Sequence, residues 1–286
     1  MSYLFERFTN SLSELRDSVS PSEAVSPVPS TSESHSDDTL SSDYQQVVDT
    51  DIVNIDVKTR KCADKFSPIV IDLSQDVLYR VNAGLSIVNS EEENDISPLL
   101  DHFLLNPNEL IISNCHVTPY FLQSIASRLQ KEILWFKLEQ CTVTPEVSLE
   151  SICTTFQSVN RFWFKQFSFG NDWVKSLLKV GKTGMLLFEM KNVSIDVLDI
   201  DKNDFLKFFK AQNERFVLQI TYNKGTVPEW RKRTDDLLKD NFVVCNTTAM
   251  VMSSRLISIQ CSKCSFQRQH RACKATYILK SGIRYK

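Results

Sequence analysis

Residues 110–119 read LIISNCHVTP and residues 136–145 read FKLEQCTVTP, so that one Cys-x-Val-Thr-Pro ending recurs after 26 residues. The same offset continues into residues 162–171 (FWFKQFSFGN) and 188–197 (FEMKNVSIDV). Two columns of large apolar residues align over the four segments, the first made of Leu110, Phe136, Phe162 and Phe188 and the second of Ile112, Leu138, Phe164 and Met190. Leucine-rich repeats have periods of about 20–29 residues. The sequence therefore predicts an array of similar structural units.

Each unit combines the spacing of a short strand with that of a helix. Apolar residues first alternate, as in a strand with one buried face. Helical spacing follows within residues 121–129, 149–156, 173–178 and 205–209. Such a unit cannot bury its apolar side alone, so neighbouring units would stack to form the core. We expect an α/β fold over residues 106–225, an irregular leucine-rich-repeat solenoid of about 26-residue units whose strands form one parallel sheet.

The composition divides the rest of the chain. Residues 1–60 carry eleven acidic and four basic residues and are rich in Ser and Pro, which predicts a disordered tail with an amphipathic helical segment at its start. Residues 61–105 are expected to hold a short helix over residues 72–85 and an acidic linker from Glu91. Residues 226–286 are expected to form a C-terminal capping segment and a basic tail, because residues 255–286 contain eight Lys or Arg and no acid.

The whole-chain composition is that of a globular protein. Of 286 residues, 42% are hydrophobic and 24% are charged, and no apolar run approaches the roughly 18–20 residues that span a bilayer. The apolar residues near Met1 are interrupted by charges, so no secretory signal is predicted and a cytoplasmic or nuclear location is expected. The eight cysteines are then expected to be reduced thiols, with Cys115 and Cys141 buried in the repeat beside the aligned Phe167 and Val193.

The repeat resembles the cysteine-containing leucine-rich repeats of F-box proteins, and in particular the F-box-associated domains of nematodes. The two Cys-x-Val-Thr-Pro units carry the resemblance together with residues 203–207 (NDFLK) and 247–251 (TTAMV), and it covers residues 106–260. Residues 72–81 (DLSQDVLYRV) look like the opening helix of a degenerate F-box in which Ser74 replaces a proline.

This resemblance implies the target-recognition part of a ubiquitin-ligase adaptor. The repeat surface would bind a protein target, and the helix would bind the linker subunit of a cullin-type ligase through Leu73, Val77, Leu78 and Val81. The alternative is a stand-alone scaffold protein that keeps the repeat surface and lacks ligase docking.

The sequence contains no pattern that indicates catalysis. Its six glycines form no nucleotide-binding loop, and no serine lies in a nucleophile elbow. A non-catalytic binding protein without a cofactor is expected. One cluster could ligate zinc, because three thiols and an imidazole at Cys261, Cys264, His270 and Cys273 could close a tetrahedral site. The alternative is ordinary reduced thiols, whereas bound zinc would favour nucleic acid as a partner, which is otherwise not expected.

The alternation along the strands also predicts a binding surface. If the apolar columns point into the core, the residues between them point to the opposite face, namely Trp135, Lys137, Arg161, Trp163 and Lys165. Trp and Arg are enriched among the few residues that dominate binding energy at interfaces. We therefore expect this face to bind the protein partner. The alternative is that an N-terminal or C-terminal segment covers the two indole rings and makes them part of a core.

Overall fold

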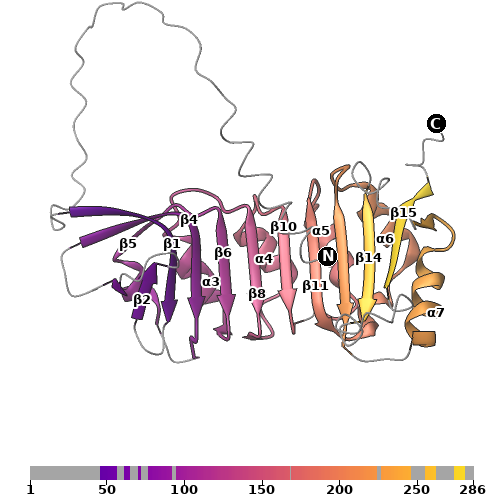
Figure 1. Ribbon diagram of the computed structural model, residues 1–286, viewed down its shortest axis with the longest axis horizontal. Coiled ribbons are helices and arrows are strands. Elements are labelled where there is room, and N and C mark those ends of the chain that lie inside the picture. The colour runs from indigo at the N-terminus through magenta and orange to yellow at the C-terminus, as the bar shows by residue number, and fades with distance from the viewer. Residues whose placement is uncertain are drawn as a thin grey trace, which may run out of the picture. The chain divides into compact units, whose positions relative to one another are not determined.

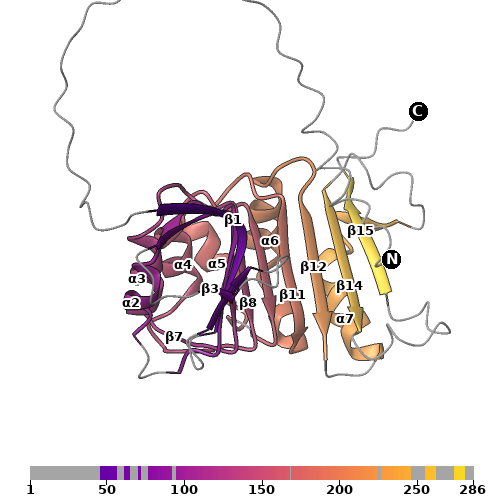
Figure 2. The same ribbon diagram turned by 60° about the vertical axis from the view of Figure 1, so that its left-hand side comes forward.

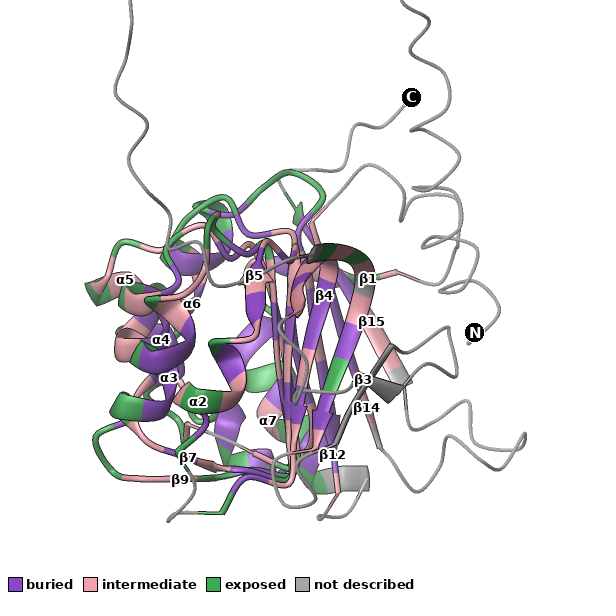
Figure 3. Ribbon diagram, turned by 90° about the vertical axis from the view of Figure 1, so that its left-hand side faces the viewer, coloured by how far each residue is buried: buried purple, intermediate pink, exposed green. Residues whose placement is uncertain are grey.

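The computed structural model describes residues 46–56, 61–64, 70–71, 77–91, 95–167, 169–223, 227–245, 255–261 and 274–280. In this part of the chain, strands form one large, mostly parallel sheet, and helices α2 to α6 lie on one of its faces (Figures 1 and 2). The buried residues gather between the helices and the sheet (Figure 3). The predicted α/β class is therefore confirmed. The expectations for the tail before residue 46 lie outside the described residues.

Five strands are each followed by a helix between residues 109 and 238. The pairs are β6 (Glu109–Ser113) with α3 (Pro119–Ala126), β8 (Trp135–Glu139) with α4 (Leu149–Thr155), β10 (Arg161–Lys165) with α5 (Trp173–Lys179), β11 (Leu187–Val193) with α6 (Lys202–Lys210), and β12 (Val217–Tyr222) with α7 (Val227–Leu238). All five strands pair in parallel in chain order. The prediction of at least four parallel strand-turn-helix units over residues 106–225 is confirmed, while their assignment as leucine-rich repeats stays a prediction.

Further strands extend the sheet on both sides. On the β6 side lie β4 (Val77–Val88), β1 (Gln46–Asp56), β2 (Lys61–Asp64) and β3 (Val70–Ile71), and β5 (Phe103–Leu105) also pairs with β4 after the short helix α2 (Ser97–Leu100). On the β12 side lie β14 (Leu256–Cys261), β15 (Lys274–Leu279) and β13 (Phe242–Val244). The strands β7 (His116–Val117) and β9 (Thr142–Val143) form a separate small sheet. Part of the expected basic tail is thus made of sheet strands.

Residues that are 26 positions apart in the sequence lie opposite each other on neighbouring strands of the sheet. Phe136 lies opposite Phe162, which lies opposite Phe188, and Leu138, Phe164 and Met190 align in the same way. These side chains are fully buried against the helix layer. Equivalent positions of consecutive units therefore stack side by side across the sheet. As a result, the Phe162 ring packs against the rings of Phe136 and Phe188 in the neighbouring units.

Residues with left-handed backbone conformation form a column at the carboxyl ends of the strands. Positive φ angles of 52° to 59° occur at Asn89, Asn114, Gln140, Gln166 and Asn192, which are 25 or 26 residues apart. At each of the first four, the backbone N–H donates to a carbonyl of the next strand, as from Gln140 to Lys165 at 3.0 Å. Side chains continue this ladder, because Asn114 Nδ2 donates to Asn89 Oδ1 at 2.7 Å and Asn89 Nδ2 donates to Asp56 Oδ2 at 3.0 Å.

Glutamine is poorly suited to this backbone conformation, whereas glycine adopts it freely. Gln166→Gly is therefore expected to raise the free energy of unfolding by about 0.5–1 kcal/mol. Glycine relieves the backbone strain, and the larger conformational entropy that it loses on folding offsets part of this gain. Urea denaturation measures the change. Gln166→Ala is the control, since alanine removes the side chain but keeps the strain, and it should leave stability nearly unchanged. A clear loss of stability in the glycine variant would contradict this explanation.

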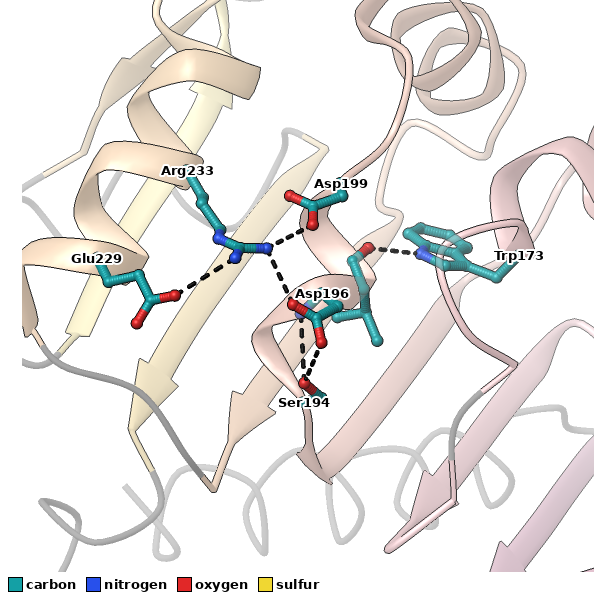
Figure 4. Close-up of polar contacts among 7 residues, drawn as sticks. Trp173, Ser194, Asp196, Asp199, Glu229 and Arg233 are labelled. Atoms are coloured by element: carbon teal, nitrogen blue, oxygen red, sulfur yellow. Dashed lines mark hydrogen bonds and ion pairs between the residues drawn. The ribbon is translucent and has the colours of Figure 1, made fainter.

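Ion pairs attach helix α7 to the preceding unit (Figure 4). Arg233 of α7 donates to Asp196 and Asp199, which lie in and just after the 3-10 helix η1 (Ile195–Leu198), and also to Glu229 one turn away. The indole N–H of Trp173 donates to the Val197 carbonyl at 3.0 Å and fixes η1 from the other side. This cluster is a structural link between consecutive units. No helix in the described part of the chain combines the length and apolar composition needed to cross a membrane.

The expected helix over residues 72–85 is wrong where the structure describes it, because residues 77–88 form strand β4. Two residues of β4, between Val81 and Gly84, lie opposite a single residue of β1, between Thr50 and Ile52, which is a β-bulge. Tyr79 and Val81 are buried before the bulge, and Leu85 and Ile87 are buried after it. The buried positions therefore keep the two-residue alternation of a strand on both sides of the bulge. Val77, Val81 and Leu85 are four residues apart, a spacing that fits one face of a strand and also one face of a helix.

The expected disordered tail also extends too far. Residues 46–56 form strand β1, which pairs in parallel with the whole length of β4. Val53 and Ile55 are fully buried and flank the exposed Asn54. Asp49 is exposed and pairs with Arg80, and Asp56 is the last residue of the strand, so the charge content obscured a strand pattern.

The cysteines of the repeat are buried thiols, as expected. Cys115 and Cys141 lie in adjacent units at 2% and 7% exposure, and Val193 is buried in the corresponding position. Phe167 is only partly buried, so that part of the expectation is not met. The hydrogen bond to Cys115 and burial both raise the pKa of Cys141, and burial raises the pKa of Cys153 to about 11. These two thiols therefore stay protonated at neutral pH.

Candidate protein-interaction surface

The five predicted surface residues lie together on the face of the sheet opposite α2 to α6. This face carries no helix among the residues that the structure describes and is here called the helix-free face. Trp135, Lys137, Arg161, Trp163 and Lys165 occupy the alternate positions of β8 and β10, between the buried apolar residues. The parallel register places Trp135 beside Arg161, and Lys137 beside Trp163. The expected outward direction is confirmed, and all five side chains are partly buried.

Each indole on this face is flanked by two cations. The Lys137 Nζ atom lies 4.0 Å from the centre of the Trp135 ring, and the Arg161 guanidinium carbon lies 5.6 Å from it. Around Trp163, the Nζ atoms of Lys191 and Lys165 lie at 5.2 and 6.0 Å. Contacts of this kind contribute about 0.5–1 kcal/mol each at exposed sites. They also hold the rings in defined orientations before any partner binds.

The lysines are neutralised by glutamates of neighbouring positions. Lys137 pairs with Glu109 of β6, and Lys165 pairs with Glu139 of β8. Lys191 pairs with Glu189 within β11 at 3.0 Å. Arg161, by contrast, forms no ion pair with any residue that the structure describes. The helix-free face therefore presents one cation beside Trp135 whose charge is available to an acidic group.

Sequence reasoning missed Glu189 and Lys191 as members of this face. Glu189 lies opposite Trp163 and is only 2% exposed, so burial raises the pKa of its carboxyl group while Lys191 opposes that shift. The 26-residue offset could have identified both, because it carries Trp163 to Glu189 and Lys165 to Lys191. The surface therefore extends from β8 to β11.

The other predicted sites are not assembled in the described structure. Val77, Leu78 and Val81 lie in strand β4, where Val81 is fully buried, and Leu73 lies outside the described residues. The helix expected to bind a ligase is therefore a strand within the sheet over these positions. Of the proposed zinc ligands, Cys264, His270 and Cys273 lie outside the described residues, and Cys261 ends strand β14. No group of three metal-ligating side chains occurs among the residues that are described.

Fold and surface together define an α/β protein with a mostly parallel sheet, helices on one face and cation-flanked indoles on the other. In comparisons with known proteins, no family model and no curated protein sequence matches the chain. The functional assignment must therefore come from the chemistry of the chain itself.

Proposed function

We propose that this chain is a non-catalytic protein-interaction module, an irregular leucine-rich-repeat solenoid that binds a protein partner on its helix-free face. The solenoid assignment is supported by the 26-residue register shared by β6, β8, β10 and β11, and by the left-handed residue that recurs at the carboxyl end of each of these strands. Arrays of this type use the surface of their sheet for binding, since that surface varies without disturbing the stacked core.

The arrangement of Trp135, Arg161 and Trp163 is the observation that carries the proposal. Two partly buried indoles on adjacent strands offer a large apolar contact area with little entropy to lose, because cations already orient the rings. Arg161 adds a charge that no described carboxylate neutralises. Trp and Arg are the residue types that most often dominate interface energies.

A stand-alone scaffold is favoured over a ligase adaptor. Residues 77–88 are taken up by strand β4, which lies between β1 and β6 and leaves no helix there to dock on a linker subunit. The full-length protein is therefore expected not to bind the linker subunit of a cullin-type ubiquitin ligase in a pull-down assay. Saturable binding that Leu78→Asp abolishes would restore the adaptor hypothesis.

The combined variant Trp135→Ala with Trp163→Ala tests the surface directly. It should lower the free energy of unfolding by less than about 2 kcal/mol, since only partly buried rings and their cation contacts are removed. The same variant should lose the partners that the wild-type protein captures from a cell lysate, as quantified by mass spectrometry.

Two further variants complete that experiment. Arg161→Gln keeps both rings and should reduce partner capture without a measurable change in stability. Lys175→Ala, on the exposed side of α5, should change neither property. Partner capture that survives in the double variant, or unfolding of that variant, would show that the helix-free face is not the binding site.

A further inference from the structure

A polar hollow of about 510 Å³ lies at the carboxyl ends of strands β4, β6 and β8, where the arrowheads end in Figure 1. Its lining consists of Asn89, Ser90, Glu91, Asn114, Cys115, His116, Gln140 and Thr142. None of these residues belongs to the helix-free face, so the hollow is separate from the proposed partner surface. Ligands of open parallel sheets commonly bind at the carboxyl ends of strands.

The left-handed column supplies carboxamides to the hollow. The side-chain amide group of Asn114 donates to Asn89, and that of Asn89 donates to Asp56, so both of these donor groups are already used. In the described structure, the Asn114 side-chain oxygen and the whole Gln140 carboxamide make no hydrogen bond, and both residues are exposed. One acceptor from Asn114 and both a donor and an acceptor from Gln140 therefore face the hollow on adjacent units.

A buried hydroxyl group in the lining lacks a partner. Ser90 is only 2% exposed, and its Oγ atom makes no hydrogen bond, although its backbone is fixed by bonds to Cys115 and His116. Native proteins rarely bury a polar atom without a hydrogen bond, and such an atom calls for an explanation. A bound molecule that donates to Ser90 Oγ, or accepts from it, would supply the missing bond.

The lining chemistry selects the class of ligand. Among the residues named above there is no Lys or Arg to neutralise an anion, and Glu91 would repel one. The imidazole of His116 is the one ring in this lining, and no Val, Leu, Ile, Met, Phe or Trp is present to bury an apolar group. Carboxamides and hydroxyls both donate and accept, which matches the vicinal hydroxyl groups of a sugar. A smaller hollow of about 40 Å³ shares Glu91 and His116 and reaches Tyr120, whose 65% exposure leaves its ring face open to the C–H surface of a pyranose.

We propose that this hollow is a binding site for a short neutral saccharide. The carboxamides of Asn114 and Gln140 and the Ser90 hydroxyl bind its hydroxyl groups, and Tyr120 packs against its margin. The volume lies within the range of about 300–1,000 Å³ that is usual for small-ligand sites.

The test measures binding of maltose, cellobiose and N,N′-diacetylchitobiose to the full-length protein by calorimetry and ligand-observed NMR. At least one of them should bind with a dissociation constant below about 10 mM. Gln140→Gly should weaken that binding at least about tenfold, because at least one hydrogen bond is lost, while making the protein more stable. A loss of binding in a variant that is more stable cannot be attributed to unfolding. Ser90→Ala should weaken binding by a similar factor.

Gln166→Gly is the matched control, because Gln166 has the same backbone conformation one unit further along and does not line the hollow. It should leave saccharide binding unchanged. The proposal is overturned if none of the three sugars binds, if Gln140→Gly and Gln166→Gly have equal effects, or if inorganic phosphate or a dipeptide amide binds more tightly than every sugar.

Discussion

Phe164→Ala is expected to lower the free energy of unfolding by about 3–5 kcal/mol, the usual cost of deleting a buried aromatic side chain. Phe164 is fully buried in the middle of β10. Its ring lies within 6.5 Å, centre to centre, of Phe136, Phe162, Phe169 and Phe188. The alanine variant would leave a cavity between three stacked units, which cannot collapse without shifting the register. Urea denaturation followed by circular dichroism measures the change.

Trp163→Ala is the matched control for this prediction. Trp163 is the adjacent residue on the same strand, it is larger than Phe164, and it lies on the helix-free face. Its removal should cost only about 1 kcal/mol, mainly the contacts with Lys165 and Lys191. Equal losses in the two variants would contradict the assignment of one face to the core and the other to binding.

The repeat could be predicted from sequence because its information is periodic. Each strand from β6 to β11 places the same residue types at the same offset, so one alignment gave the strands, the helices and the inward columns together. The same alternation gave the five residues of the helix-free face. Their ion pairs could not be predicted, because Lys137 and Lys165 reach glutamates on the preceding strand and the length of a lysine side chain does not fix its direction.

The region before the repeat could not be predicted, for a different physical reason. Strands β1 and β4 are far longer than the others, and only the end of β4, from Gly84, continues the repeat into β6, at an offset of 25 residues. The rest of β4 pairs with β1 and β5, so no further segment of the repeat confirms its pattern. Val77, Val81 and Leu85 lie four residues apart, which fits one face of a strand as well as one face of a helix. A local pattern of this kind needs knowledge of the partner strand, which the sequence does not contain.

The polar hollow was also missed, although its signal was present. Asn89, Asn114, Gln140, Gln166 and Asn192 recur at nearly constant spacing, and Asn is the common non-glycine residue in left-handed turns. Attention to polar columns as well as apolar ones would have located the carboxyl ends of the strands. The unpaired Ser90 hydroxyl, however, depends on packing that no sequence pattern reports.

Val81→Asp is expected to cost at least about 4 kcal/mol, because it places a carboxyl group without a partner in the core. Val81 is fully buried and lies opposite Thr50 of β1 and Leu105 of β5. Burial would hold the pKa of the new carboxyl above its value in the unfolded chain, so the folded state would bind more protons as the pH falls. The stability loss should therefore be larger at pH 8 than at pH 5, as measured by denaturation at both pH values.

Asn82→Asp is the matched control, because it introduces the same side chain one residue later at a partly exposed position. Its cost should stay below about 1 kcal/mol and should change little between the two pH values. The contrast between neighbouring residues distinguishes a strand in the core from an exposed docking helix, on which both substitutions would be tolerated. If Val81→Asp were as mild as Asn82→Asp, residues 77–88 would not form a core strand, and the adaptor hypothesis would regain the helix that it requires.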